Sequence, residues 1–258
     1  MTLFYKTLKD GRNKFIDFDD ICEGESCILV GGAPSLKNEN LDLLRKPGVA
    51  TIGINNVATL FKPTFWISGD KPDCFVKQIL YDPSIIKFIN WSRRANKING
   101  QMWGTFPNTY SYSCVENITI NNFLTRGSHL AWWKNTWFIA LQLAYKLGFR
   151  KVYMVGADFK ISTKEQYAWE TDIKEKYINM NVRLYQNAVN IMRDLIPHFS
   201  KHNFEVFNCS RTSALRADFG FLPLEEAVKK ITKNILFEKT NNLPHSRALK
   251  ENLTKNNS

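Results

Sequence analysis

The segment "ILVGGAPSLKN", from Ile28 to Asn38, joins a continuous apolar run to a cluster of two glycines, an alanine, a proline and a serine. A chain that only needs to reverse its direction can do so with one glycine or an Asn-Gly pair. The larger cluster indicates that another group approaches the backbone closely, because glycine has no Cβ to block it. The segment therefore predicts a buried strand followed by a turn against which a ligand can lie.

Five further short runs share the character of this strand, since they are rich in β-branched and aromatic residues and several lack alternation. They span 49–54, 64–68, 85–90, 151–156 and 204–208. Continuous apolar strands are typical of parallel sheets that are covered on both faces. Helical patterns occupy 130–149, 182–196 and 222–236, and we expect Pro197 to end the second of them. This alternation predicts an α/β fold: a Rossmann-like, doubly wound, mostly parallel sheet with helices on both faces.

The chain is expected to form a single α/β domain over residues 1–238. Within it, about 92–129 is predicted to be an irregular insertion, because its Asn, Gly, Tyr and Ser content fits neither pattern. Residues 239–258 are polar and unpatterned, which predicts a mobile tail.

No segment reaches the roughly 18 apolar residues that a membrane span needs, and the start of the chain lacks the apolar core of a signal peptide. We therefore expect a cytoplasmic protein. The five cysteines are scattered and have no nearby histidine, so reduced thiols and no metal site are expected. A formal net charge of +11 fits an acidic partner such as a nucleotide, nucleic acid or anionic membrane, although AT-rich coding would also enrich lysine.

Small and hydrogen-bonding residues follow most of the predicted strands. In open α/β sheets, ligands bind where the carboxyl ends of the strands meet. Taken singly, the residues that follow any one strand could form a turn or, in the case of Asp158, cap a helix. Together they predict a nucleotide-type site, with glycine backbone N–H groups available to a phosphate. The residues concerned are Gly31, Gly32, Pro34 and Ser35, then Asn55 and Asn56, then Asp70, then Asp158.

Four blocks, "GGAPSLK" (31–37), "IGINN" (52–56), "NTWFIALQLAYKLGFRKVYMVGADF" (135–159) and "YAWE" (167–170), give the chain a family resemblance. In order and spacing, it resembles the bacterial lipooligosaccharide sialyltransferases and their phage-encoded relatives. The resemblance implies a GT-A variant of the Rossmann-like fold. It also implies transfer of a sugar from a CMP-linked donor, without a metal or other cofactor.

The resemblance also implies roles for single residues. Tyr167 matches a tyrosine that binds the leaving phosphate, and Lys160 stands where the family has a second such tyrosine. The family's catalytic histidine has no equivalent, so the general base is expected to be Asp70, with His129 as the alternative. Nucleotide binding is implied for Gly31, Gly32, Pro34, Ser35, Asn55 and, near the base or ribose, Thr136.

The leading functional hypothesis is a metal-independent glycosyltransferase whose acceptor is a glycan or a hydroxymethylated base in phage-type DNA. A DNA acceptor would need stacking and phosphate-binding side chains. Two alternatives remain open. A pterin-type pyrophosphokinase would need ATP and magnesium, and a non-catalytic nucleotide- or DNA-binding module would show no turnover. The candidates for DNA contact are Trp132, Trp133 and Trp137, for which packing of a helix in the core is the favoured alternative, with Arg93, Arg94, Arg126 and Lys134.

Overall fold

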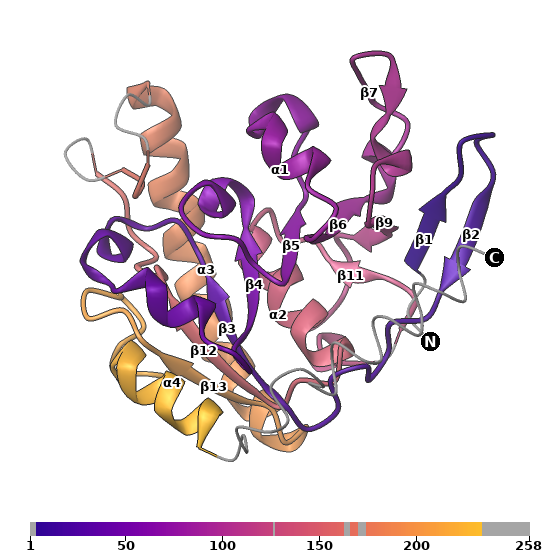
Figure 1. The fold of residues 1–258 in the computed structure, drawn as a ribbon. Helices are drawn as coiled ribbons and strands as arrows, with labels where there is room; N and C mark the ends of the chain where they lie inside the picture. The colour runs from indigo at the N-terminus through magenta and orange to yellow at the C-terminus, as the bar shows by residue number, and fades with distance from the viewer. Residues whose placement is uncertain (1–3, 126, 163–165, 170–173, 234–258) are drawn as a thin grey trace.

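The computed structural model describes residues 4–125, 127–162, 166–169 and 174–233. Its centre is a nine-stranded sheet (Figure 1). The seven strands at one end run parallel, and the last two are antiparallel to their neighbours. In sheet order they are β13 (Glu205–Asn208), β12 (Lys151–Val155), β3 (Ser26–Val30), β4 (Ala50–Ile54), β5 (Phe65–Ser68), β6 (Ile86–Asn90), β9 (Thr109–Tyr112), β1 (Phe4–Thr7) and β2 (Asn13–Ile16).

All six strands predicted from the sequence are present, and the α/β class with a mostly parallel sheet is confirmed. The β1–β2 hairpin was not predicted. The treatment of 92–129 as wholly irregular was wrong, because β9 lies within it and pairs with β6. Strand β9 reads "TYSY", and its two polar residues are buried, with the hydroxyl of Ser111 donating to the carbonyl of Tyr5 at 3.2 Å.

Two long helices cover one face of the sheet, α2 (Thr136–Lys146) and α3 (Glu175–Lys201). They share a hydrophobic core with side chains of that face, such as Leu29 and Ile52. The other face is covered by α4 (Leu224–Thr232) together with short 3-10 helices, which pack on Ile28 and Val30. Helices therefore lie on both faces as predicted, but 3-10 turns form much of the second layer. These turns include η1 (Pro34–Asn38), η2 (Leu41–Arg45) and η3 (Asn55–Thr59).

Both long helices differ from their predicted bounds. Helix α2 begins only at Thr136, because Leu130–Ala131 form strand β11 and Asn135 caps the helix by accepting a hydrogen bond from the N–H of Trp137 at 3.0 Å. Helix α3 continues past Pro197, although proline lacks the N–H that would pair with the carbonyl of the preceding turn. Its last turn is retained because Phe199 is buried in the same core as the rest of the helix.

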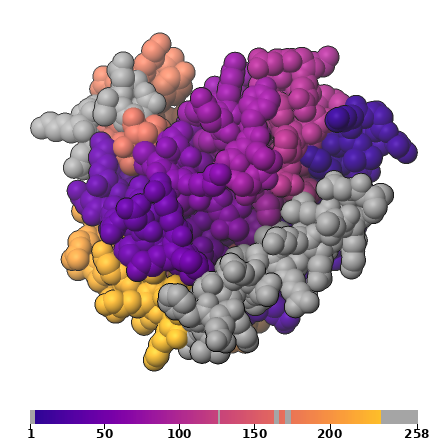
Figure 2. Space-filling model, viewed as in Figure 1, coloured from indigo at the N-terminus to yellow at the C-terminus, as the bar shows by residue number. Residues whose placement is uncertain are grey.

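The remaining described elements are short. They are α1 (Lys77–Tyr81), β7 (Lys97–Ile98), β8 (Gln101–Met102), β10 (Cys114–Val115), which pairs with β11, η4 (Pro72–Cys74), η5 (Trp91–Arg93), η6 (Trp103–Thr105) and η7 (Ile120–Asn122). The space-filling view shows the β1–β2 hairpin at one side of the molecule and α4 at the opposite side (Figure 2). No helix among the described residues is both long and apolar enough to cross a bilayer. The predicted tail at 239–258 lies outside the described residues.

Lys6 and Lys87 are among the lysines that direct their ammonium groups to backbone carbonyls inside the fold. Lys6 donates to the carbonyls of Phe106 at 2.5 Å and Thr109 at 3.4 Å, which ties β1 to the start of β9 and to the loop before it. Lys87 is fully buried and donates to the carbonyls of Asp82 at 2.6 Å and Ile85 at 2.9 Å. Burial lowers the pKa of Lys6 to about 8 and that of Lys87 to about 7.

The order of the sheet reverses between β3 and β12. From β3 the chain proceeds in one direction through β4, β5, β6 and β9, whereas β12 and β13 lie on the other side. Such a switch point opens a crevice at the carboxyl ends of the strands. Gly31 and Gly156 are in close contact there, because a Cβ on Gly156 would overlap the carbonyl oxygen of Gly31. The N–H of Gly31 also donates to the carbonyl of Val155, the residue before Gly156, at 2.9 Å. The fold therefore places the glycine turn at the position where a ligand crevice is expected.

Candidate functional site

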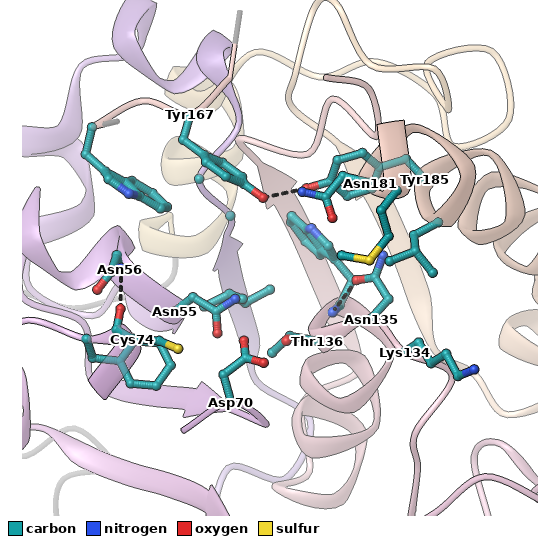
Figure 3. A pocket seen from close by; sticks show the side chains of 18 of the residues that line it. Asn55, Asn56, Asp70, Cys74, Lys134, Asn135, Thr136, Tyr167, Asn181 and Tyr185 are labelled. Atoms are coloured by element: carbon teal, nitrogen blue, oxygen red, sulfur yellow. Dashed lines mark hydrogen bonds between the residues drawn. The ribbon is translucent and has the colours of Figure 1, made fainter. Parts of the chain in front are cut away.

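A cavity of about 390 Å³, called the main cavity here, opens at the carboxyl ends of β3, β4 and β5 (Figure 3). The start of α2 and the first half of α3 complete its walls. The structure therefore brings together predicted site residues from segments far apart in the chain. Those that line the main cavity are Gly31, Gly32, Asn55, Asn56, Asp70, Trp132, Lys134, Thr136, Trp137 and Tyr167.

The close approach predicted at the glycine turn is made by two indole rings of the protein itself. A Cβ on Gly31 would overlap Trp137 and would lie 2.7 Å from the carbonyl oxygen of Gly156. A Cβ on Gly32 would overlap Trp169. The neighbouring Ala168 N–H donates to the carbonyl of Gly32 at 2.9 Å, which holds this segment on the turn. The glycines thus admit tryptophan side chains, and a ligand would meet the turn beside these rings.

Beyond the glycines, the turn is held by a buried carboxylate. Pro34 begins η1, and the backbone N–H of Ser35 donates to Asp158 Oδ2 at 3.1 Å. Asp158 is only 2% exposed, and neither its Oδ1 nor the Ser35 hydroxyl has a hydrogen-bond partner within the described parts of the chain. Asp158 therefore fixes the start of η1, a different segment of the chain, and the described residues directly after it, 159–162, form no helix that it could cap. With Lys160, it lines two small cavities of about 30 and 90 Å³ rather than the main cavity.

The two asparagines after β4 present polar atoms to the main cavity. Asn55 has a left-handed backbone, with φ of 53°, and its carbonyl accepts a hydrogen bond from the Trp66 indole N–H at 2.6 Å. Its side-chain Oδ1 is buried and unpartnered among the residues described. Asn56 donates from Nδ2 to the carbonyl of Cys74 at 2.9 Å. Asparagine adopts left-handed geometry more readily than most residues with a Cβ, and the hydrogen bond from Trp66 helps to fix Asn55 in this conformation.

Asp70 follows β5 and directs its carboxylate into the main cavity (Figure 3). Its backbone N–H donates to the Ser68 hydroxyl at 3.1 Å, which fixes the turn. Burial raises the pKa of Asp70, and the positive charge of Arg93 opposes this effect. Arg93 ends η5, which follows the adjacent strand β6, so the predicted phosphate partner lies near the candidate base instead. The indole of Trp132 covers the preceding Gly69, where a Cβ would lie 2.6 Å from its ring.

Two neighbouring tyrosines lie on the wall of the main cavity opposite Asp70 (Figure 3). Their hydroxyl groups, on Tyr167 and Tyr185, lie 3.4 Å apart, and the Tyr167 ring stacks on Trp169 with centroids 5.3 Å apart. Burial raises the pKa of both phenols, so they are protonated donors at neutral pH. Tyr185 was not predicted as a site residue, because in the sequence it reads only as one member of the apolar face of a helix.

Several other candidates do not reach the main cavity. His129 is exposed, with Nδ1 2.8 Å from the Ser128 hydroxyl. Arg94 lies over the Trp91 ring at 3.6 Å and donates to the Trp91 carbonyl at 2.9 Å. Arg126 lies outside the described residues.

The three tryptophans predicted for DNA contact do not share one surface: Trp132 and Trp137 line the main cavity, whereas Trp133 does not. Trp137 is buried beneath the glycine turn. Trp133 stacks on Phe123 and donates from Nε1 to the carbonyl of Ile118 at 3.2 Å. Lys134 lines the main cavity, but its side chain extends away from Asp70 (Figure 3). Within the described ranges, no three His, Cys, Asp or Glu side chains are placed to hold a metal ion.

Two solved structures are similar to this chain. One is the sialyltransferase CstII from Campylobacter jejuni in complex with a substrate analogue, cytidine-5'-monophosphate, with 15% identity, a TM-score of 0.47, and coverage of 79% of this chain and 87% of that one. The other is the MAf glycosyltransferase from Magnetospirillum magneticum AMB-1, with 12% identity and a TM-score of 0.47, where 97% of this chain spans 39% of that one. No protein-family model and no curated protein sequence matches the chain. The structure itself shows an α/β protein with a mostly parallel sheet and a polar cavity at its switch point.

Proposed function

We propose that this protein is a glycosyltransferase that moves a sugar from a nucleotide-sugar donor to a hydroxyl group of an acceptor. One observation carries the proposal: the main cavity brings the carboxylate of Asp70, an exposed residue, opposite a pair of partly buried phenols, Tyr167 and Tyr185. A proton acceptor and neutral hydrogen-bond donors on opposite walls suit a displacement at a sugar carbon between them. The ordered sequence blocks that resemble sialyltransferases agree with this reaction class.

The reaction can be written with these groups. The acceptor oxygen attacks the anomeric carbon while the bond from that carbon to the donor phosphate breaks. The acceptor proton passes to Asp70, and the bonding electron pair leaves with the phosphate oxygen. The raised pKa of Asp70 suits a general base, because proton transfer is most effective when the pKa lies near the working pH. Tyr167 and Tyr185 would donate hydrogen bonds to the departing phosphate and so stabilise its charge without a metal.

The remaining wall of the main cavity fits the nucleotide. Asn55 offers a buried amide oxygen without a partner among the described residues, and Thr136 stands at the first position of α2. The N-terminus of a helix favours negative charge, since its backbone N–H groups have no partners within the helix. We therefore propose that the phosphate of the donor lies between this helix end and the tyrosine pair, close to Gly31 and Gly32.

The test separates turnover from binding. Asp70→Asn keeps the shape of the side chain but removes the base, so turnover should fall by about 10²- to 10⁴-fold. Nucleotide binding should be retained, because Asp70 is assigned to the acceptor proton and not to the nucleotide. At 100 times its Kd, the nucleotide should then still add about 2.7 kcal/mol to the free energy of unfolding. The exposed Asp73, which lines no described cavity, provides the matched control Asp73→Asn. Unchanged turnover in Asp70→Asn would refute the role of Asp70.

The same experiment addresses the alternative functions. A panel of CMP, CDP, UDP, GDP and ATP, with and without magnesium, identifies the donor class. Stabilisation by ATP only in the presence of magnesium would favour the pyrophosphokinase, but its two expected carboxylates, Asp70 and Asp158, line different cavities. Nucleotide binding without turnover on any glycan or DNA acceptor would favour a non-catalytic module.

A further inference from the structure

A second cavity, of about 500 Å³, lies beside the main cavity and is called the side cavity here. The two share Trp132, Lys134 and Leu184, so they are neighbouring compartments of one depression. The main cavity is accounted for by the donor and the reacting groups. The side cavity has no role in that scheme.

The walls of the side cavity are largely apolar. Ile118 and Ile120 come from the segment after β10, Ile191 comes from α3, and the indoles of Trp132 and Trp133 complete the surface. The Trp133 ring is held rigidly, since it stacks on Phe123 with centroids 5.0 Å apart and its Nε1 is bonded to Ile118. Rigid indoles bind the apolar faces of ring-shaped ligands with little loss of conformational entropy.

Trp132 connects this surface to the chemistry of the main cavity. Its six-membered ring lies against Gly69, the residue immediately before Asp70. An acceptor whose hydroxyl group reaches Asp70 would therefore have the rest of its structure over Trp132, in the direction of the side cavity. Lys134, which lines both cavities, adopts a left-handed backbone with φ of 56°. Non-glycine residues in this conformation concentrate at functional sites.

The charges at the side cavity argue against a nucleic acid. Among its described lining residues, Lys134 is the one cation, and Glu116 is an anion that would repel phosphates. Nucleic-acid surfaces instead need several cations along the backbone path. Of the three arginines that were candidates for phosphate contact, Arg94 lies over the Trp91 ring, Arg93 is near enough to Asp70 for its charge to lower the pKa of that carboxyl, and Arg126 lies outside the described residues.

We propose that the side cavity binds the acceptor, and that the acceptor is a small glycoside with an aromatic or alkyl aglycone. The aglycone would lie between Trp132, Trp133 and Ile191, and the sugar hydroxyl would reach Asp70. This inference rests on the proposed function, because it assigns the second substrate of the same site.

The test compares phenyl β-D-galactopyranoside with methyl β-D-galactopyranoside, which differ only in the aglycone. Binding is measured by saturation-transfer NMR and by tryptophan fluorescence, without turnover. We expect the phenyl compound to bind at least tenfold more tightly. Asn187→Trp should abolish this preference by filling the side cavity, because Asn187 is exposed and lines it. Gln186→Trp, at the adjacent exposed position outside the lining, should retain the preference.

Each outcome gives a decision. Equal affinity for the two glycosides, or equal loss of the preference in both tryptophan variants, would overturn the inference. Displacement of the phenyl compound by a short single-stranded DNA would also overturn it, in favour of a nucleic-acid acceptor. Nucleotide stabilisation without the aglycone preference would leave the proposed function intact. A preference without any nucleotide binding would support the side cavity as a ligand site while the proposed function failed.

Discussion

Replacing Gly156 by alanine is expected to destabilise the protein more than any other glycine substitution of similar backbone geometry. Gly156 has φ of 62°, and an added Cβ would overlap the carbonyl oxygen of Gly31 on the neighbouring strand. The left-handed geometry costs alanine about 1–2 kcal/mol. Forcing an extra methyl into a packed position costs about 1–3 kcal/mol more. The free energy of unfolding should therefore fall by about 2–5 kcal/mol in total.

Gly220 provides the matched control, because its φ is 57° and an added Cβ would meet nothing within 4 Å. Gly220→Ala should lose only the conformational share, about 1–2 kcal/mol. Both substitutions reduce the entropy of the unfolded chain equally, so this effect cancels between them. Urea denaturation with a common m-value measures the difference. If the two variants lose the same stability, the glycines at the switch point are not in the close contact described.

Three further predictions concern side chains. Tyr167→Phe should lower kcat while leaving nucleotide stabilisation largely unchanged, since the phenol is assigned to the departing phosphate; a change in KM alone would contradict this. Arg93→Met should shift the acid limb of the pH–rate profile to higher pH, because the Arg93 charge lowers the pKa of Asp70; an unmoved limb would exclude this coupling. Burial lowers the pKa of Lys87 from its ordinary value of 10.5 to about 7 in the folded chain. The unfolded chain therefore binds more protons between these values, so stability should rise with pH by up to about 1.4 kcal/mol per pH unit. Urea denaturation at several pH values should show this slope in the wild type and lose its Lys87 contribution in Lys87→Met.

The main sheet could be predicted because its central strands are continuous apolar runs bounded by small residues. The runs at 27–31 and 151–156 became β3 and β12 with bounds within a residue or two. Strand β9 was missed because its Thr109 and Ser111 made a buried strand appear polar. Burial of those hydroxyl groups depends on partners far away in sequence, such as Tyr5.

The site was predicted only in part. Residues that directly follow strands, such as Asn55 and Asp70, were brought to one edge because parallel strands share the direction of their carboxyl ends. Tyr185 could not be identified from its helical periodicity, because its role depends on how α3 packs beside Tyr167. The approach of Trp169 to Gly32 depends likewise on a contact between segments more than a hundred residues apart, which no local pattern encodes.

Because Lys6 and Lys87 face the interior, the folded protein carries less positive charge than the formal count from its sequence. The formal charge of +11 counts every lysine as protonated, but these two have pKa values of about 8 and 7 in the folded chain. Folding at pH 9 should therefore release about two protons into the buffer. This release would make the calorimetric enthalpy of unfolding depend on the ionisation enthalpy of the buffer chosen. It would also weaken retention on a cation-exchange matrix in mildly alkaline solution, where the unfolded chain would still carry both charges.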